Sequence, residues 1–330
     1  MRLTTSWLLI IDGILKKRVQ LITSILRVFM KIDFYCNEVF DGWEPTDKRL
    51  GGTEESIKEW AEELSKRGHE LNVYRNGTYH MFDYEVLYQP REEYHDDADI
   101  VICVKDSDFK PKVPCLYLTN EVDADTKDLS YYEAVIFPSE WAVENIPVNN
   151  PRKFILPHGY DDKKINTSQK KIKKQCLYAS SPDRGLRTLE QIWPSIVEQH
   201  PDAHLYVTYG GKIDTPNTTC GEFAEDEMND LFNTSDIWTH PCSGGELYGI
   251  SGIKAQAAGA IPVYFPTMAL AETVQGGVAC KDAREMYQVL CELLGDEEAK
   301  QAHREKLAKL NLPTWETSTD VLEEIIQSVL

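Results

Sequence analysis

A carboxylate and a guanidinium stand at two points of this chain where parallel α/β proteins bind their ligands. Residues 241–265 read PCSGGELYGISGIKAQAAGAIPVYF, so Glu246 follows two glycines and precedes a stretch with helical periodicity. Arg184 lies in the turn SSPDRG, directly after an expected strand. In parallel α/β units, ligands bind outside the carboxyl ends of the strands, where glycines let them approach the amides of a helix N-terminus. Glu246 is therefore a candidate site residue, and Arg184 is a candidate partner for an anionic ligand.

Each of these residues also has an ordinary structural interpretation. A glutamate in the first turn of a helix can simply complement the helix macrodipole. An arginine at position 184 can form a surface ion pair with Asp183 or Glu190. His240, in the strand before the glycines, fits a packed histidine as well as a ligand. These alternatives stay open at the level of the sequence.

The element that must position Glu246 is predicted to be a strand, a glycine turn, a helix and a second strand. An apolar run at 236–242 leads into the glycines, and the helical pattern ends at Gly259. A second apolar run follows at 261–265. This order is typical of a parallel α/β unit.

A similar unit is expected near the start of the chain. A strand at 32–36 leads through a polar loop to Gly51 and Gly52, and Thr53 can cap the helix that follows. Free amides at such a helix mouth can hold a phosphate, and an ordinary tight turn gives the same pattern.

The chain divides into two α/β halves joined by a polar linker. Further strands are expected at 71–74, 84–88, 100–104, 115–118, 134–138, 176–179 and 204–209. Their order predicts doubly wound sheets. The predicted division is an extension at 1–29, a Rossmann-like domain at 30–160, a linker at 161–174, a second Rossmann-like domain at 175–314 and a terminal segment at 315–330.

Composition narrows the kinds of ligand and compartment. The chain has 330 residues, 42% of them hydrophobic, and a formal net charge of −19. This charge argues against nucleic-acid binding through a basic face, and an anionic substrate would need a local positive site. The eight cysteines lie far apart, without CxxC pairs or histidines at zinc spacing. We expect reduced, mostly buried thiols and a cytoplasmic protein.

The first 29 residues differ from the remainder. They carry five basic residues against one acidic residue, and apolar side chains recur at helical spacing from Leu15 to Phe29. Three interpretations remain open. The segment is a basic amphipathic helix that contacts a membrane surface, a helix that packs on protein, or an extension upstream of a natural start at Met30.

Three separated motifs together resemble the family 4 retaining glycosyltransferases, which have the GT-B fold. They are GGTE at 51–54, SSPDRGL at 180–186 and GGELYGISGIKAQAAGAIPV at 244–263. The similarity spans about residues 30–330. It implies two Rossmann-like domains facing across a cleft, with the acceptor on the first, the nucleotide-sugar donor on the second, and a helix at 315–330 crossing back to the first.

The resemblance assigns roles to individual residues. Glu246 matches a glutamate near the donor sugar, and Arg184 matches a basic residue that contacts the diphosphate. Gly51 and Gly52 match the glycine turn that approaches the phosphates. The positions whose backbone amides would meet the donor are Gly245, Tyr248, Gly249 and Ile250.

Three positions depart from the family pattern. Lys254 replaces a second glutamate that usually accepts hydrogen bonds from the ribose, which an ammonium cannot do. An arginine expected near Ser180 is absent. A His-Asp pair on the acceptor side aligns with Thr119 and Asn120, which leaves Glu121 or Asp123 to serve an acceptor hydroxyl.

The resulting hypothesis is a metal-independent enzyme that needs no cofactor. It would move a hexose-like sugar from a nucleotide diphosphate to a glycan or other hydroxyl acceptor, with retention. Two alternatives are a non-catalytic GT-B protein that binds nucleotide sugars or glycans, and an epimerase or phosphorylase on the same fold.

Overall fold

The computed structural model describes residues 29–37, 42–47, 50–120, 122–167 and 169–330. The interpretations of residues 1–28 and the role suggested for Glu121 therefore lie outside the described residues. Among the residues that are described, no helix combines the length and the apolar character needed to cross a bilayer.

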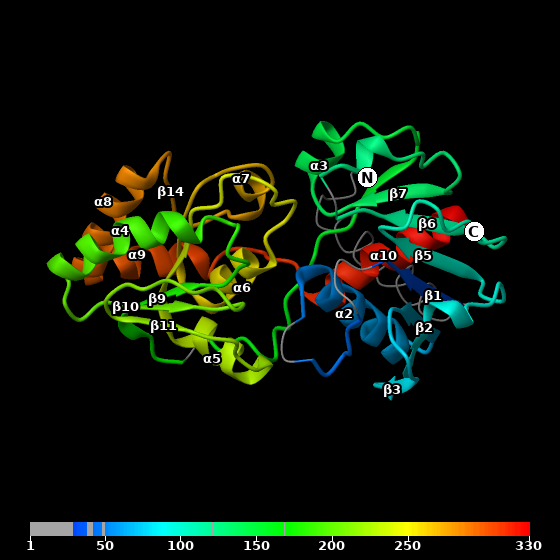
Figure 1. The fold of residues 1–330 in the computed structure, drawn as a ribbon, viewed down its shortest axis with the longest axis horizontal. Coiled ribbons are helices and arrows are strands. Elements are labelled where there is room, and N and C mark those ends of the chain that lie inside the picture. The colour runs from blue at the N-terminus through cyan, green and yellow to red at the C-terminus, as the bar shows by residue number, and fades with distance from the viewer. Residues whose placement is uncertain (1–28, 38–41, 48–49, 121, 168) are drawn as a thin grey trace, which may run out of the picture.

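The first half is built on an eight-stranded sheet in the order β3-β4-β2-β1-β5-β6-β7-β8 (Figure 1). All neighbouring strands are parallel except β3, which runs antiparallel to β4. The strands are β1 (Lys31–Cys36), β2 (Glu70–Arg75), β3 (Met81–Asp83), β4 (Val86–Pro90), β5 (Ile100–Val104), β6 (Cys115–Leu118), β7 (Ala134–Phe137) and β8 (Lys153–Ile155). The helices are α2 (Gly52–Lys66), α3 (Glu140–Asn145) and the 3-10 turns η1 (Arg91–Glu93) and η2 (Ala124–Thr126).

The second half is built on a six-stranded parallel sheet in the order β11-β10-β9-β12-β13-β14. Its strands are β9 (Ile172–Tyr178), β10 (His204–Val207), β11 (Thr218–Cys220), β12 (Ser235–His240), β13 (Ile261–Tyr264) and β14 (Val278–Ala279). Its helices are α4 (Leu186–Gln199), α5 (Glu225–Thr234), α6 (Ile250–Ala258), α7 (Leu270–Thr273), α8 (Ala283–Gly295) and α9 (Glu297–Leu307).

The last helix, α10 (Trp315–Val329), leaves the second half and packs against α2 of the first (Figure 1). Trp315, Leu322 and Ile326 are buried in the hydrophobic core of the first sheet. The Trp60 indole on α2 donates a hydrogen bond to the Ser318 hydroxyl, with an N···O distance of 2.8 Å. The two halves are thus joined by the linker and by this returning helix.

Most predicted elements are present, and the errors lie at their edges. Gly51, not Thr53, is the N-cap of α2, and no side chain caps this helix. The strand predicted at 84–88 is β4, which is preceded by the unpredicted β3 and a turn where Tyr84 and Glu85 have positive φ. β9 begins at Ile172, so the last residues of the predicted linker are in a strand. Short edge strands such as β11 and β14 carry too few residues for a periodic signal.

The eight cysteines are all free, as expected, and six of them are buried.

Candidate functional site

A cavity of about 540 Å³ lies between the two halves. It is bordered by the N-terminal ends of α2 and α6 and by the loops after β9 and β12. Such a position, at the carboxyl ends of parallel strands, is where α/β proteins bind ligands. The predicted residues that line it are Gly51, Gly52, Asn120, Arg184, Gly245, Glu246, Tyr248, Gly249, Ile250 and Lys254.

The glycine turn of the first half faces the second half. A Cβ atom at Gly51 would lie 3.2 Å from the Tyr209 hydroxyl, and a Cβ at Gly52 would lie 3.4 Å from Ile250 Cδ1. Ile250 is the first residue of α6, so the N-terminal ends of α2 and α6 face each other across the cavity. Among the described residues neither helix has a side-chain cap, so first-turn amides can meet a ligand, although the Gly252 amide of α6 already bonds to the Gly249 carbonyl at 2.9 Å.

The loop that carries Glu246 is shaped by two glycines in the left-handed region. Gly245 has a φ of 80° and Gly249 has a φ of 85°, values that other residues adopt at a cost. Gly249 is the N-cap of α6, and the first turn of α6 contains no acidic residue. Glu246 therefore precedes the helix, and the interpretation of Glu246 as a first-turn macrodipole glutamate is wrong.

Glu246 lies between the imidazole of His240 and the guanidinium of Arg184. Its Oε2 atom is 3.8 Å from His240 Nε2 and 4.0 Å from Arg184 Nη1. Burial raises the pKa of the Glu246 carboxyl, but His240 and Arg184 outweigh burial, so that its pKa lies below the usual value. Burial likewise disfavours the charged form of His240, yet Cys242 and Glu246 bring its pKa above the usual value. Glu246 is thus an ionised hydrogen-bond acceptor at the cavity wall.

Arg184 is held over the glycine loop rather than at the open surface. Its Nη1 atom donates a hydrogen bond to the Gly244 carbonyl at 3.4 Å, and its Nε atom lies 3.6 Å from Asp183 Oδ2. Glu190, the other predicted partner, pairs with Arg187 instead. A Cβ at Gly245 would come within 2.8 Å of Arg184 Nη1, so this glycine leaves the space that the guanidinium fills.

Tyr248 joins the two halves through a residue that the sequence analysis missed. Its hydroxyl donates to the His158 carbonyl at 2.7 Å, and the two rings stack with centroids 4.9 Å apart. His158 is buried, which lowers its pKa to about 3 and keeps the ring neutral. Its Nδ1 atom is 2.6 Å from the Ser56 hydroxyl. The sequence signal for His158 was only a polar residue between Pro157 and Gly159 after the last strand of the first half.

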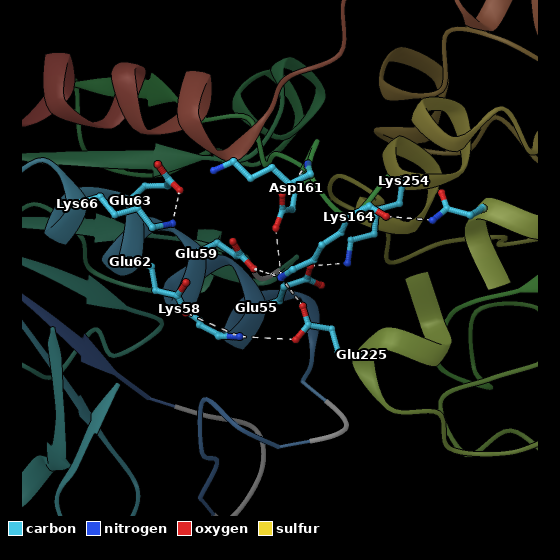
Figure 2. Close-up of polar contacts among 12 residues, drawn as sticks. Glu55, Lys58, Glu59, Glu62, Glu63, Lys66, Asp161, Lys164, Glu225 and Lys254 are labelled. Carbon is cyan, nitrogen blue, oxygen red and sulfur yellow. Dashed lines mark hydrogen bonds and ion pairs between the residues drawn. The ribbon is translucent and has the colours of Figure 1, made fainter. Parts of the chain in front are cut away.

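Lys254 forms an ion pair with Glu55, so the side chains of α6 and α2 meet across the cavity (Figure 2). The pair belongs to a wider network. Lys58 lies 3.8 Å from Glu225, and Lys164 of the linker lies 2.6 Å from the same carboxylate. These contacts tie α2, the linker and α5 together.

Of the four residues suggested for the acceptor side, Asn120 alone is among the described residues that line the cavity. Its Nδ2 atom donates to the Thr53 hydroxyl at 3.4 Å. Thr119 is buried at the end of β6, where its amide bonds to the Ile136 carbonyl. Asp123 precedes η2 and is not among the described residues of the cavity wall, so neither Thr119 nor Asp123 is placed to serve a ligand there.

Glu59 on α2 belongs to this network through Lys164, and its ionisation makes the free energy of unfolding depend on pH. Burial raises the pKa of this carboxyl to about 7, against the attraction of Lys164 at 3.9 Å. Because the folded state then holds the proton more tightly than the unfolded chain, this contribution to stability is present at low pH and is lost as pH rises through 7. Glu59→Gln should therefore stabilise the protein at pH 8 by about 1–3 kcal/mol, and hardly at pH 5.

Urea unfolding at the two pH values measures this difference. Glu63→Gln is the matched control, because Glu63 lies on the same helix and pairs with Lys66 at 2.6 Å. A Glu59→Gln variant that is less stable than the parent at pH 8 would show that attraction to Lys164 outweighs burial.

Comparison with solved structures identifies the architecture. No protein-family model matches the sequence, and no curated protein matches it. Sucrose-phosphate synthase from Thermosynechococcus elongatus superposes with a TM-score of 0.70 at 14% identity, over 91% of this chain and 99% of that chain. HepE of Anabaena, in complex with UDP and glucose, superposes with a TM-score of 0.68 at 13% identity, over 91% of this chain and 100% of that chain. WaaG, a glycosyltransferase involved in lipopolysaccharide biosynthesis, superposes with a TM-score of 0.67 at 14% identity, over 88% of this chain and 99% of that chain. The chain therefore has the GT-B fold, with two parallel-sheet halves and a shared cavity between them.

Proposed function

We propose that this protein is a glycosyltransferase that moves a sugar from a nucleotide diphosphate to a hydroxyl acceptor, with retention and without a metal. The observation that carries the proposal is the cavity wall, where Arg184 and Glu246 stand beside the N-terminal ends of α2 and α6. In the transfer, the bond between the anomeric carbon and a diphosphate oxygen breaks. The acceptor oxygen bonds to that carbon, and its proton passes to the diphosphate.

The side chains have complementary roles in this proposal. Arg184 and the uncapped amides of the two helices offset the charge that grows on the leaving diphosphate. Glu246, whose pKa is lowered by His240 and Arg184, accepts hydrogen bonds from hydroxyls of the donor sugar. Lys254 reaches a phosphate only when it leaves Glu55, so donor binding exchanges one ion pair for another.

The acceptor is expected to enter from the side of the first half. There Asn120 offers an amide at the cavity wall, and His158, a neutral ring, is another residue of the lining. Support for the donor class comes from the solved structures, since HepE was crystallised with UDP-glucose.

The test is a panel of UDP, GDP, ADP and their sugar conjugates, read by thermal shift and by release of free nucleotide in the presence of EDTA. We expect one nucleotide diphosphate to raise the melting temperature and its sugar conjugate to be slowly hydrolysed. With an acceptor, the anomeric proton coupling of the product should match that of the donor. Binding without nucleotide release would instead indicate a binding protein, and no shift by any nucleotide would overturn the proposal.

A further inference from the structure

The end of β12 gathers three metal-ligating side chains that the proposed transfer does not need as a group. His240, Cys242 and Glu246 each offer one ligand atom, and these atoms all lie within 4.8 Å of one another. The three come from one short segment, since His240 ends β12 and the other two lie in the loop before α6. Because the backbone of this segment is fixed by the strand and by the glycines, the three side chains converge without a contribution from another element.

His240 is the second reason to see a site here. Its side chain is 1% exposed, and neither ring nitrogen has a hydrogen-bond partner among the described residues. Buried polar groups in proteins are nearly always hydrogen-bonded. Its Nε2 atom faces Glu246 Oε2 at 3.8 Å, which is too long for a hydrogen bond. An ion between the two groups would occupy that gap.

The thiol of Cys242 limits which metal ion the site would prefer. This thiol is buried and donates a weak hydrogen bond to the Gly244 carbonyl, with an S···O distance of 3.2 Å. The Cys242 carbonyl is fixed by the Thr267 hydroxyl at 2.6 Å. A set of one imidazole, one thiolate and one carboxylate suits Zn²⁺, whereas Mg²⁺ and Ca²⁺ prefer oxygen ligands alone.

We propose that His240, Cys242 and Glu246 bind Zn²⁺, and that this ion inhibits the protein by withdrawing Glu246 from the cavity. On binding, the Cys242 thiol loses its proton to solvent as the zinc–sulfur bond forms. Ligand atoms around tetrahedral zinc are about 3.5 Å apart, and the three candidate atoms lie within 4.8 Å of one another, so each pair must draw together by about 1.3 Å at most. Glu246 lines the cavity, which gives the ion its entry path and leaves the fourth position open to water.

The inhibitory part rests on the proposed function, whereas the site itself does not. An oxygen of Glu246 that ligates the ion gives electron density to the metal and becomes a weaker hydrogen-bond acceptor for a donor sugar. A bound Zn²⁺ would also release Arg184 from its contact with Glu246 at 4.0 Å. Zinc and donor are therefore expected to compete.

The test of the site uses Co²⁺ as a spectroscopic probe on the full chain, under reducing conditions and without any sugar. We expect one equivalent of Co²⁺ to produce a thiolate charge-transfer band in the near ultraviolet, which Zn²⁺ abolishes by displacement. Cys242→Ser should lose the band. Cys291→Ser, which removes a half-buried thiol from α8, should keep it. If Cys242→Ser fails to fold, His240→Gln should weaken Co²⁺ binding at least tenfold, in line with loss of a ligand.

No band in the parent protein, or the same band in Cys242→Ser, would overturn the site and leave a simple His240–Glu246 ion pair. Inhibition is measured separately, as the effect of Zn²⁺ on nucleotide release relative to the metal-free rate of each variant. We expect strong inhibition of the parent and of Cys291→Ser, and little of Cys242→Ser. An ion that binds but leaves nucleotide release unchanged would overturn the inhibitory role.

Discussion

Replacing Arg184 with alanine should lower the rate of sugar transfer by about 10²–10³-fold while leaving the fold nearly as stable as before. The guanidinium lies at the cavity wall and is 27% exposed, with one long hydrogen bond and two ion pairs of 3.6 Å and 4.0 Å. Contacts of that length contribute little to folding. A diphosphate in the cavity would instead meet Arg184 at short range, where its charge stabilises the leaving group.

The control is Arg187→Ala, three residues further along. Arg187 is 84% exposed, and its one ion pair within the described part of the chain is with Glu190, at 3.8 Å, on the same helix. We expect this variant to keep both turnover and stability. Two measurements on both variants distinguish a role in transfer from a role in folding. They are steady-state rates with the donor found in the nucleotide panel, and urea unfolding. If Arg184→Ala loses stability and activity in parallel, the arginine is a structural residue.

The second large effect is expected at Gly185, where an alanine should destabilise the protein by about 3 kcal/mol or more. A Cβ atom there would lie 2.0 Å from the Pro241 carbonyl oxygen and 2.6 Å from its carbon, so backbone would have to move. Gly185 also has a φ of 97°, which a side chain disfavours. The backbone that must shift lies directly after β12, and it continues through Cys242 into the loop that carries Glu246. Donor affinity should therefore fall along with stability.

Gly244→Ala is the matched control for this prediction. Gly244 lies in the loop of Glu246, and a Cβ there would meet nothing within 4 Å. We expect its stability to change by no more than about 0.5 kcal/mol. Urea unfolding compares the two variants directly. Equal stability of the two variants would mean that the loop after β12 can move away from Gly185 without a loss of folding free energy.

Local patterns were sufficient to predict most of the strands and to place Arg184 and Glu246 at the cavity wall. Hydrophobic runs and glycine turns are properties of contiguous sequence, and so the strand before Glu246 and the helix after it could be located. Because parallel strands end at one edge, Arg184 and Glu246 could be expected on one wall, and their charged groups lie 4.0 Å apart.

Contacts between the halves could not be predicted in this way. Lys254 was recognised as a departure from the family pattern, but its partner Glu55 lies 199 residues away on another helix. His158 gained its neutral state from burial by Tyr248 and its neighbours, which no local pattern reveals. On the acceptor side, Thr119 and Asn120 follow each other directly after β6, and yet Thr119 is buried while Asn120 lines the cavity. Such differences depend on how the two halves are placed.

The return of α10 to the first half has a consequence for biosynthesis. Leu322, Ile325 and Ile326 complete the core that surrounds β1, which is formed almost three hundred residues earlier. Domains emerging from the ribosome generally fold in order, the N-terminal one first. Here the nascent N-terminal domain must wait, with the α2 face that α10 covers still exposed, until residue 326 has left the exit tunnel. The second domain, whose strands and helices are contiguous, can fold before the first is finished.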